Sequence, residues 1–393
     1  MYRPKAIDLF AGAGGLSLGF EQAGFDIVSA VEIDPVHACV HKYNFPNTKI
    51  FCENIENLSG IDLMAGHDKI DLIIGGPPCQ GFSMIGKRDM NDHRNSLVMQ
   101  YMRIVKEVQP RYFVMENVGG ITVGKAKDIL EAAIFFIEEN GYKVVKPYRV
   151  LNAANYGVPQ ARKRLFLLGY KEGETEPEYP LENDEHSTVH DAISDLPNID
   201  LYSELLESDV LDYSVKPQSY YARKLHDVTL DQTDFSYRRL WNPNVVTGEL
   251  RTIHTDKSKE RFAATKPGET EPISRFYKLS YEGVCNTLRA GTDKSRGAHT
   301  SPRPIHPQHC RCISVREAQR LHSFPDWFRV HSTKWHGFRE VGNSVPPLLA
   351  RSIGLSIAKA MHYSPCVPED SIELGNEQFL YVNATEAAKL LEV

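Results

Sequence analysis

The chain has 393 residues, of which 41% are hydrophobic and 24% charged, so it can bury a full α/β core and a second, smaller domain. This composition excludes a wholly disordered protein, and no stretch of about 18 apolar residues predicts a membrane-spanning helix. The first residues reach glycine before they could form the apolar centre of a signal peptide, so we expect a cytoplasmic protein without a membrane partner. Seven cysteines, an odd number, indicate reduced thiols.

The net charge of −6 hides an uneven distribution along the chain. Between Glu172 and Val215 there are fourteen Asp or Glu and no Lys or Arg, whereas between Lys216 and Arg303 sixteen Lys or Arg outnumber ten Asp or Glu. An acidic total argues against a nucleic-acid partner, but a basic segment of this length removes that objection. The charge pattern therefore leaves nucleic-acid binding open.

Short apolar runs alternate with longer amphipathic segments from residue 5 to residue 170. The apolar runs predict buried parallel strands at 5–11, 25–32, 69–76 and 111–118, and the amphipathic segments predict helices at 16–24, 36–44, 96–108 and 125–141. Residues 142–157 and 162–170 predict further strands at one edge. The predicted fold class is α/β, with a doubly wound, mostly parallel sheet that binds ligands at the carboxyl ends of its strands.

The periodicity weakens after residue 170, and residues 172–187 are acidic and interrupted by proline. Residues 171–312 therefore predict a second, smaller domain that is loop-rich and partly β. Residues 313–363 return to the domain formed by residues 1–170, with a short helix that Pro325 ends and a longer helix within 345–363. Residues 364–393 form an acidic tail, which we expect to pack only on the surface.

A glycine cluster in DLFAGAGGLSLGF (Asp8 to Phe20) lies between a predicted strand and a predicted helix. There the backbone can approach a ligand, although glycine also serves tight turns and the spacing is not GxGxxG. The next strand ends at Glu32, which could accept both ribose hydroxyls of a nucleoside, or could stand by chance beside a helix-capping Asp34. Together these features favour a nucleoside cofactor. Asn54, after the third strand, could meet an adenine edge or be a polar turn residue.

GGPPCQGFS (Gly75 to Ser83) places Cys79 directly after a predicted strand, and hence at the carboxyl end of the sheet. Pro77 and Pro78 fix their own φ angles, which would present the thiol in one orientation. Gly81 and the polar run after it could form a loop that closes over a substrate. A lone cysteine is more often a small buried hydrophobe than a nucleophile, and the prolines shift that balance only modestly.

RYFVMENV ends a strand with Glu116, which is either a surface group or an acid whose pKa burial raises. Because Cys79 is predicted at the end of the adjacent strand, the interpretation of Glu116 as an acid is favoured. Arg162 and Arg164 in PQARKRLF lie on one side of an extended segment, where they could anchor a phosphate and a base oxygen or form a solvated edge.

These motifs, in this order, resemble those of the DNA (cytosine-5)-methyltransferase family. DLFAGAGGLSLGF, GGPPCQGFS, MENV, QARKR, SVREAQRLHSFP and VGNSVPPLLA each resemble a family motif, and together the resemblance covers residues 5–170 and about 285–361. It implies an S-adenosylmethionine-dependent methyltransferase fold. Residues 1–170 and 313–363 would form the catalytic domain, and residues 171–312 the target-recognition domain.

The resemblance also implies roles for individual residues. Cys79 would attack carbon 6 of cytosine, Glu116 would protonate or hydrogen-bond ring nitrogen 3, Arg164 would bind the base oxygen, and Arg162 would support a phosphate or the loop. The family usually has Asp where this chain has Asn54, which would weaken the adenine contact. The S-adenosylmethionine contacts would be Phe10, Gly12, Gly14, Leu16, Glu32, Ile33, Asn54, Pro77 and Asn343. The DNA contacts would include Gln80 and Ser83. In the basic residues 287–307 we also expect Arg289, Lys294 and Arg296 to contact phosphates, and the alternative is a solvated loop.

The resulting hypothesis is a monomeric enzyme that flips a cytosine out of double-stranded DNA and methylates it, paired in function with a restriction endonuclease. Three alternatives remain: an RNA (tRNA) cytosine-5 methyltransferase, a nicotinamide-dependent oxidoreductase and a catalytically silent DNA-binding protein. The run HPQHCRC contains His306, His309, Cys310 and Cys312, but its crowded spacing matches no common zinc finger. We therefore expect no metal site.

Overall fold

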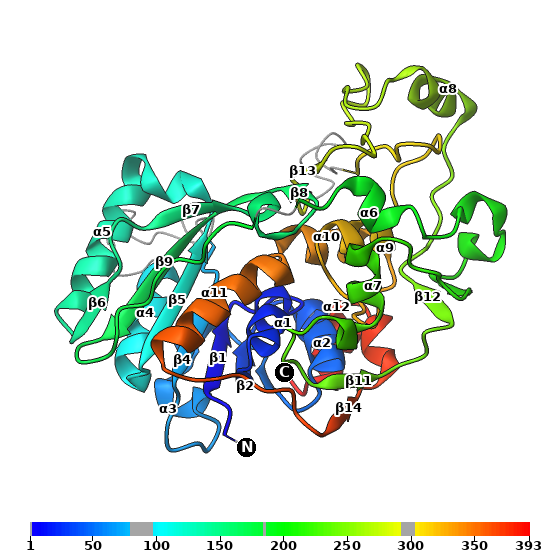
Figure 1. Ribbon diagram of the computed structural model, residues 1–393. Coiled ribbons are helices and arrows are strands. Elements are labelled where there is room, and N and C mark those ends of the chain that lie inside the picture. The colour runs from blue at the N-terminus through cyan, green and yellow to red at the C-terminus, as the bar shows by residue number, and fades with distance from the viewer. Residues whose placement is uncertain (1, 79–96, 184–185, 292–302) are drawn as a thin grey trace.

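The computed structural model describes residues 2–78, 97–183, 186–291 and 303–393, and its centre is an eight-stranded sheet (Figure 1). The strand order is β3-β2-β1-β4-β5-β9-β6, with β7 also paired to β9. The bounds are β1 (Lys5–Leu9), β2 (Asp26–Val31), β3 (Lys49–Phe51), β4 (Leu72–Gly75), β5 (Tyr112–Asn117), β6 (Tyr142–Val144), β7 (Arg149–Asn152) and β9 (Lys163–Lys171). Strands β1 to β5 pair in parallel, and β9 is antiparallel to its neighbours. The predicted fold class is confirmed.

Helices cover both faces of the sheet, because successive strand residues point to opposite sides. Ile7 and Leu9 of β1 pack in one hydrophobic cluster with α4 and α5, whereas Ala6 packs in the other cluster with α1 and α11. The chain order of the strands reverses between β1 and β4, and a sheet of this kind opens a crevice for ligands at that point. The helices on the two faces are α1 (Gly15–Gln22), α2 (Pro35–Asn44), α3 (Gly60–Leu63), α4 (Leu97–Val108), α5 (Gly124–Glu138) and α11 (Pro347–Ala360).

Residues 171–312 contain short elements and long connections. These elements are α6 (Val189–Ile193), β10 (Val210–Asp212), α7 (Tyr220–His226), β11 (Arg238–Leu240), β12 (Val245–Thr247), α8 (Asp256–Ala264) and β13 (Cys285–Asn286). Strand β13 pairs with β8 (Gln160–Ala161), and Val189, Tyr221 and Leu288 share the hydrophobic cluster that contains α1 and α11. The segment is thus joined to residues 1–170 by a small two-stranded sheet and by a common core, and its independence as a domain stays a prediction.

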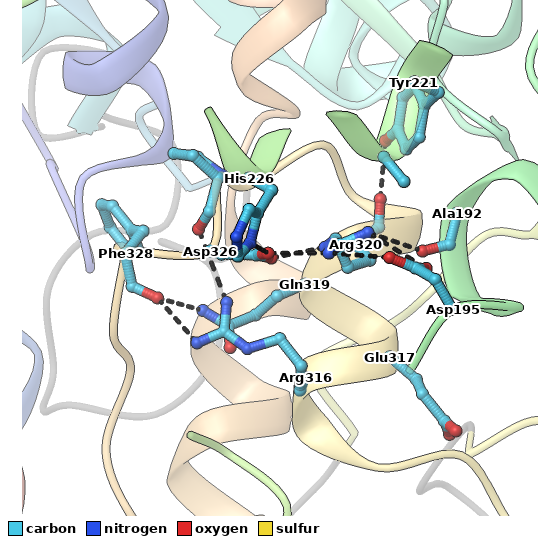
Figure 2. A network of polar contacts seen from close by, with 12 residues as sticks. Ala192, Asp195, Tyr221, His226, Arg316, Glu317, Gln319, Arg320, Asp326 and Phe328 are labelled. Carbon is cyan, nitrogen blue, oxygen red and sulfur yellow. Dashed lines mark hydrogen bonds and ion pairs between the residues drawn. The ribbon is translucent and has the colours of Figure 1, made fainter. Parts of the chain in front are cut away.

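Helix α9 (Val315–Leu321) is joined to this segment by two fully buried arginines (Figure 2). Arg320 pairs with Asp326, lies 3.4 Å from Asp195, and donates to the carbonyl oxygen of Ala192 at 3.2 Å. One turn away, Arg316 donates to the carbonyl oxygen of Thr247 at 2.9 Å. Buried guanidinium groups are stable only when their donors are bonded, so these contacts fix α6 and β12 relative to α9.

The C-terminal residues do not lie only on the surface, contrary to the expectation from the sequence. Strand β14 (Ser371–Glu373) pairs with β11, and Leu380, Val382 and Ala387 are buried in two small clusters with side chains of α2. Helix α12 (Ala384–Leu390) begins at Asn383, whose side chain accepts from two backbone N–H groups. Acidic composition was misleading here because a few apolar residues at the right spacing are sufficient to bury one face.

The described part of the chain contains no helix with both the length and the apolar character needed to cross a membrane. Its six cysteines are free thiols, in agreement with the expectation of reduced cysteine.

Candidate active site

The turn between β1 and α1 has the left-handed backbone that its glycines permit. Gly12 has φ 55° and Gly14 has φ 101°, and even Phe10 adopts φ 65°. A Cβ atom added to Gly14 would lie 2.5 Å from the Phe45 ring, whereas one added to Gly12 would meet nothing within 4 Å. Gly14 is therefore required for packing, and Gly12 lines open space in which a ligand could approach the backbone. Leu16 is buried in the core below this turn.

Glu32, at the end of β2, is bonded to this glycine turn. Its carboxylate accepts from the backbone N–H of Gly12 at 2.8 Å and from that of Asp34 at 2.8 Å. Burial raises the pKa of Glu32, and the two N–H groups oppose that shift. Asp34 caps α2 by accepting from the backbone N–H of Val36. Glu32 has a separate role, because its carboxylate joins the backbone that follows β1 to the backbone that follows β2. The adjacent Ile33 is 66% exposed, a large apolar side chain without cover.

The other residues expected near a cofactor lie in different settings. Asn54 caps a short 3₁₀ helix, Ile55–Asn57, by accepting from the backbone N–H of Glu56 at 3.1 Å, which is the turn role considered from the sequence. Asn343 is exposed and is the last residue of α10 (Lys334–Asn343). Pro77 is buried, and its carbonyl oxygen accepts from the side-chain amide of Asn117 at 2.8 Å, which fixes the chain after β4 to the end of β5.

Glu116 and Arg164 form an ion pair at the carboxyl end of β5. Arg164 Nε lies 2.9 Å from Glu116 Oε1, and only 15% and 12% of the two side chains are exposed. Burial raises the pKa of Glu116, and the charges of Arg164 and Arg162 oppose it. A Cβ atom added to Gly76 would lie 2.9 Å from Glu116 Oε2, so the chain leaving β4 passes directly beside this carboxyl group. The expected juxtaposition of the two strand ends is therefore present up to Pro78.

Arg162, which was expected to support a phosphate or the loop, contacts two backbone carbonyl groups in the described part of the structure. Its side chain is fully buried, and it donates to the carbonyl oxygens of Leu288 at 2.7 Å and Gly342 at 2.8 Å. Burial lowers the pKa of Arg162 to about 9. A guanidinium group enclosed in this way cannot reach a phosphate in solvent. It instead holds the segment before Arg289 and the end of α10 against the start of β9.

Arg289 is exposed directly after Leu288, and its backbone packs against Gly342, where an added Cβ atom would lie 2.3 Å from the Arg289 carbonyl carbon. The backbone that carries this basic side chain is thus held by the same contacts that Arg162 makes. Cys79, Gln80, Ser83, Lys294 and Arg296 lie outside the described residues.

Gln160 is a residue of the site that was not predicted from the sequence, because its contacts form only in the folded chain. Its side chain is fully buried, accepts from the backbone N–H of Leu288 at 3.0 Å, and donates to the carbonyl oxygen of Leu321 at 3.2 Å. Gln160 therefore joins β8 to the backbone that follows β13 and to the end of α9. The only sign in the sequence was that Gln160 lies two residues before Arg162, and glutamine is mostly exposed in folded proteins.

These contacts define a class of protein. It is a doubly wound α/β protein that has a glycine turn bonded to a carboxylate after β1 and β2, and a carboxyl–guanidinium pair at the end of β5. Comparison with known proteins gives the family. The model of the C-5 cytosine-specific DNA methylase family matches residues 4–359. The chain belongs to this family.

Individual relatives agree with that assignment. Type II methyltransferase M.XorII of Xanthomonas oryzae pv. oryzae is 53% identical over 397 residues, covering 100% of this chain and 93% of the relative. Type II methyltransferase M.DdeI of Desulfomicrobium norvegicum is 34% identical over 384 residues, covering 90% of this chain and 88% of the relative. A crystal structure described as a candidate DNA modification methyltransferase from an E. coli prophage is 34% identical, with a TM-score of 0.75, and covers 91% of this chain and 99% of that chain.

Proposed function

We propose that this chain methylates carbon 5 of a cytosine within a specific sequence of double-stranded DNA, with Cys79 as the nucleophile. Membership of the C-5 cytosine-specific DNA methylase family supports the reaction. The observation that carries the proposal is the Glu116–Arg164 pair at 2.9 Å beside the chain that leaves β4 toward Cys79. A carboxyl group and a guanidinium group at this spacing can bind ring nitrogen 3 and the adjacent carbonyl oxygen of one cytosine.

The chemistry requires both groups. The Cys79 thiolate adds to carbon 6, which breaks the ring double bond and moves its electron pair toward carbon 5, nitrogen 3 and the carbonyl oxygen. A protonated Glu116 donates to nitrogen 3, and Arg164 donates to the oxygen, so the developing negative charge is stabilised. After carbon 5 has gained its methyl group, loss of the carbon-5 proton to a base restores the double bond and releases the thiolate.

The residues around Gly12 fit S-adenosylmethionine, which would supply the electrophilic methyl group when bound. Gly12 lines open space, the Glu32 carboxylate is already oriented by two N–H groups, and exposed Ile33 offers an apolar face for adenine. Phe10, Gly14 and Leu16 would form the wall of that pocket, and Pro77 and Asn343 its sides. Asn54 would contribute less, since its amide oxygen is bonded to Glu56.

The DNA-binding proposal rests on exposed Arg289 and on the basic segment that contains it. Because a cytosine in a duplex is inaccessible, the base must be flipped out at a cost of roughly a few kcal/mol, which phosphate contacts offset. Relatives named type II methyltransferases support pairing with a restriction endonuclease that acts on the same DNA. We propose that the enzyme works as a monomer, which sedimentation of the free protein would test.

The test is transfer of tritium from labelled S-adenosylmethionine to duplex DNA and to tRNA in parallel. We expect labelled DNA and unlabelled tRNA; the opposite result would make the chain an RNA methyltransferase. Duplex DNA containing 5-fluorocytosine should trap a covalent adduct with wild-type protein and none with Cys79→Ser, which should still bind DNA. Active enzyme that forms no adduct would refute the covalent mechanism. Bisulfite sequencing of the methylated DNA would identify the recognition sequence.

A further inference from the structure

Three potential metal ligands from two helices meet beside the candidate cofactor pocket. His37 is in the first turn of α2, and His336 and Glu340 lie one turn apart on α10, on the same face of that helix. One potential donor atom of each residue lies within 4.8 Å of the other two. The sequence showed no sign of this group, because about 300 residues separate His37 from its partners.

Each of the three side chains has a buried polar atom without a hydrogen-bond partner. These atoms are His37 Nε2, His336 Nδ1 and Glu340 Oε1. His37 is 5% exposed and Glu340 only 1%. Buried polar groups are nearly always bonded, so an unpaired atom on each of the three side chains that meet here needs an explanation. A cation bound by these side chains would give each unpaired atom a partner.

One further polar atom of Glu340 is bonded to the backbone, and His37 has a carboxylate nearby. Glu340 Oε2 accepts from the backbone N–H of His331 at 2.8 Å, and His37 Nδ1 lies 3.9 Å from the Asp34 carboxylate. This separation is too long for a hydrogen bond, but the negative charge of a carboxylate beyond a ligating histidine increases the basicity of its ring. His331 is itself bonded to the Val382 carbonyl oxygen of the C-terminal tail and to Thr333. The basic neighbours are His331, whose ring centroid lies 4.7 Å from that of His336, and Arg339, whose guanidinium carbon lies 5.1 Å from the Trp335 ring centroid.

We propose that His37, His336 and Glu340 bind a divalent transition-metal cation, for which Zn²⁺ is the best match. Two imidazoles and one carboxylate are a donor set that zinc prefers, and a water molecule would complete four-coordination. Donor atoms about 2.1 Å from a tetrahedral zinc ion lie about 3.4 Å apart, so small side-chain rotations close the site. The cation would join the start of α2, just after Glu32, to α10, which ends at Asn343.

Metal binding by the purified protein tests this site without any assay of methylation. Protein stripped with a chelator is titrated with ZnSO₄ against a chromophoric zinc chelator, and thermal unfolding is followed with and without zinc. We expect one equivalent of tightly bound Zn²⁺ and a higher unfolding midpoint with zinc. A wild-type protein that binds less than about one fifth of an equivalent would overturn the proposal.

Variants identify the ligands. His336→Ala and Glu340→Gln should each weaken zinc binding at least tenfold and abolish the zinc-dependent rise in the unfolding midpoint. His309→Ala is the matched control, because His309 is also half-buried but lies beside Cys310 and Cys312, the other place where zinc could bind. This control should bind zinc like the wild type. Loss of binding in His309→Ala with retention in His336→Ala would assign the metal to HPQHCRC and refute the site. If Glu340→Gln fails to fold, the half-buried His336→Ala variant decides the question.

Discussion

Arg162 and Arg164 are two residues apart, and the structure predicts that one is needed for stability and the other for methyl transfer. Arg162→Met removes the donors of two buried carbonyl oxygens, those of Leu288 and Gly342. Each buried acceptor left unpaired costs about 1–3 kcal/mol, so the gross loss is about 2–6 kcal/mol. Removal of a desolvated charge offsets part of it, and we expect a net loss of about 2 kcal/mol or more, a large fraction of a typical stability of about 5–15 kcal/mol.

Arg164→Met is the matched control in the same segment. It removes the ion pair with Glu116, but Glu116 can then take up a proton because burial already raises its pKa. The free energy of unfolding should therefore change by about 1 kcal/mol or less, whereas methyl transfer should fall about 10²-fold or more.

Urea unfolding followed by tryptophan fluorescence measures the first quantity, and tritium transfer at low temperature, where both variants remain folded, measures the second. The reasoning would be refuted if Arg162→Met unfolded at the urea concentration of the wild type while losing methyl transfer, because Arg162 would then act on the substrate.

Three further predictions follow from buried groups. Burial raises the pKa of Glu116, so wild-type methyl transfer should fall as pH rises through that pKa. Glu116→Gln should be slower by about 10²-fold and should lack this decline. If both proteins showed the same pH profile, Glu116 would be excluded as the acid. Burial raises the pKa of Asp8 to about 7, so the folded protein holds a proton that the unfolded chain loses near pH 4. The free energy of unfolding of the wild type should then fall between about pH 4 and 7, by up to about 1.4 kcal/mol per pH unit. In urea unfolding, Asp8→Asn should increase this free energy by more at pH 8 than at pH 5. Gly19→Ala should lower the thermal unfolding midpoint and reduce the free energy of unfolding by about 1–3 kcal/mol, because the added Cβ would lie 2.3 Å from Ala350 Cβ where α1 crosses α11. Gly120→Ala is the control and should be tolerated, because its Cβ would meet nothing within 4 Å. Equal midpoints for the two variants would contradict this account of helix packing.

Much of the fold could be predicted from the sequence because its signals are local. The apolar runs that became β1, β2, β4 and β5 are bounded by turn residues, and the amphipathic segments between them have the helical period. Glu116 could be placed at a strand end because it directly follows a buried apolar run. The glycine turn was equally local, since the positive φ angles of Gly12 and Gly14 depend on a few adjacent residues.

The tail was predicted less well, since burial of Leu380 against α2 depends on a surface more than 300 residues away in the chain. Composition describes a segment alone and carries no information about the surface that it meets.

The sequence by itself determined the doubly wound sheet, the motifs that mark the family, and the strand ends at which the candidate catalytic groups stand. Only the tertiary structure decided that Arg162 is enclosed and bonded to Leu288 and Gly342, and that His37 lies beside His336 and Glu340. The physical reason is the same in both cases. A backbone conformation is set by neighbours along the chain, whereas the partners of a buried polar side chain are set by the packing of elements that are far apart in sequence.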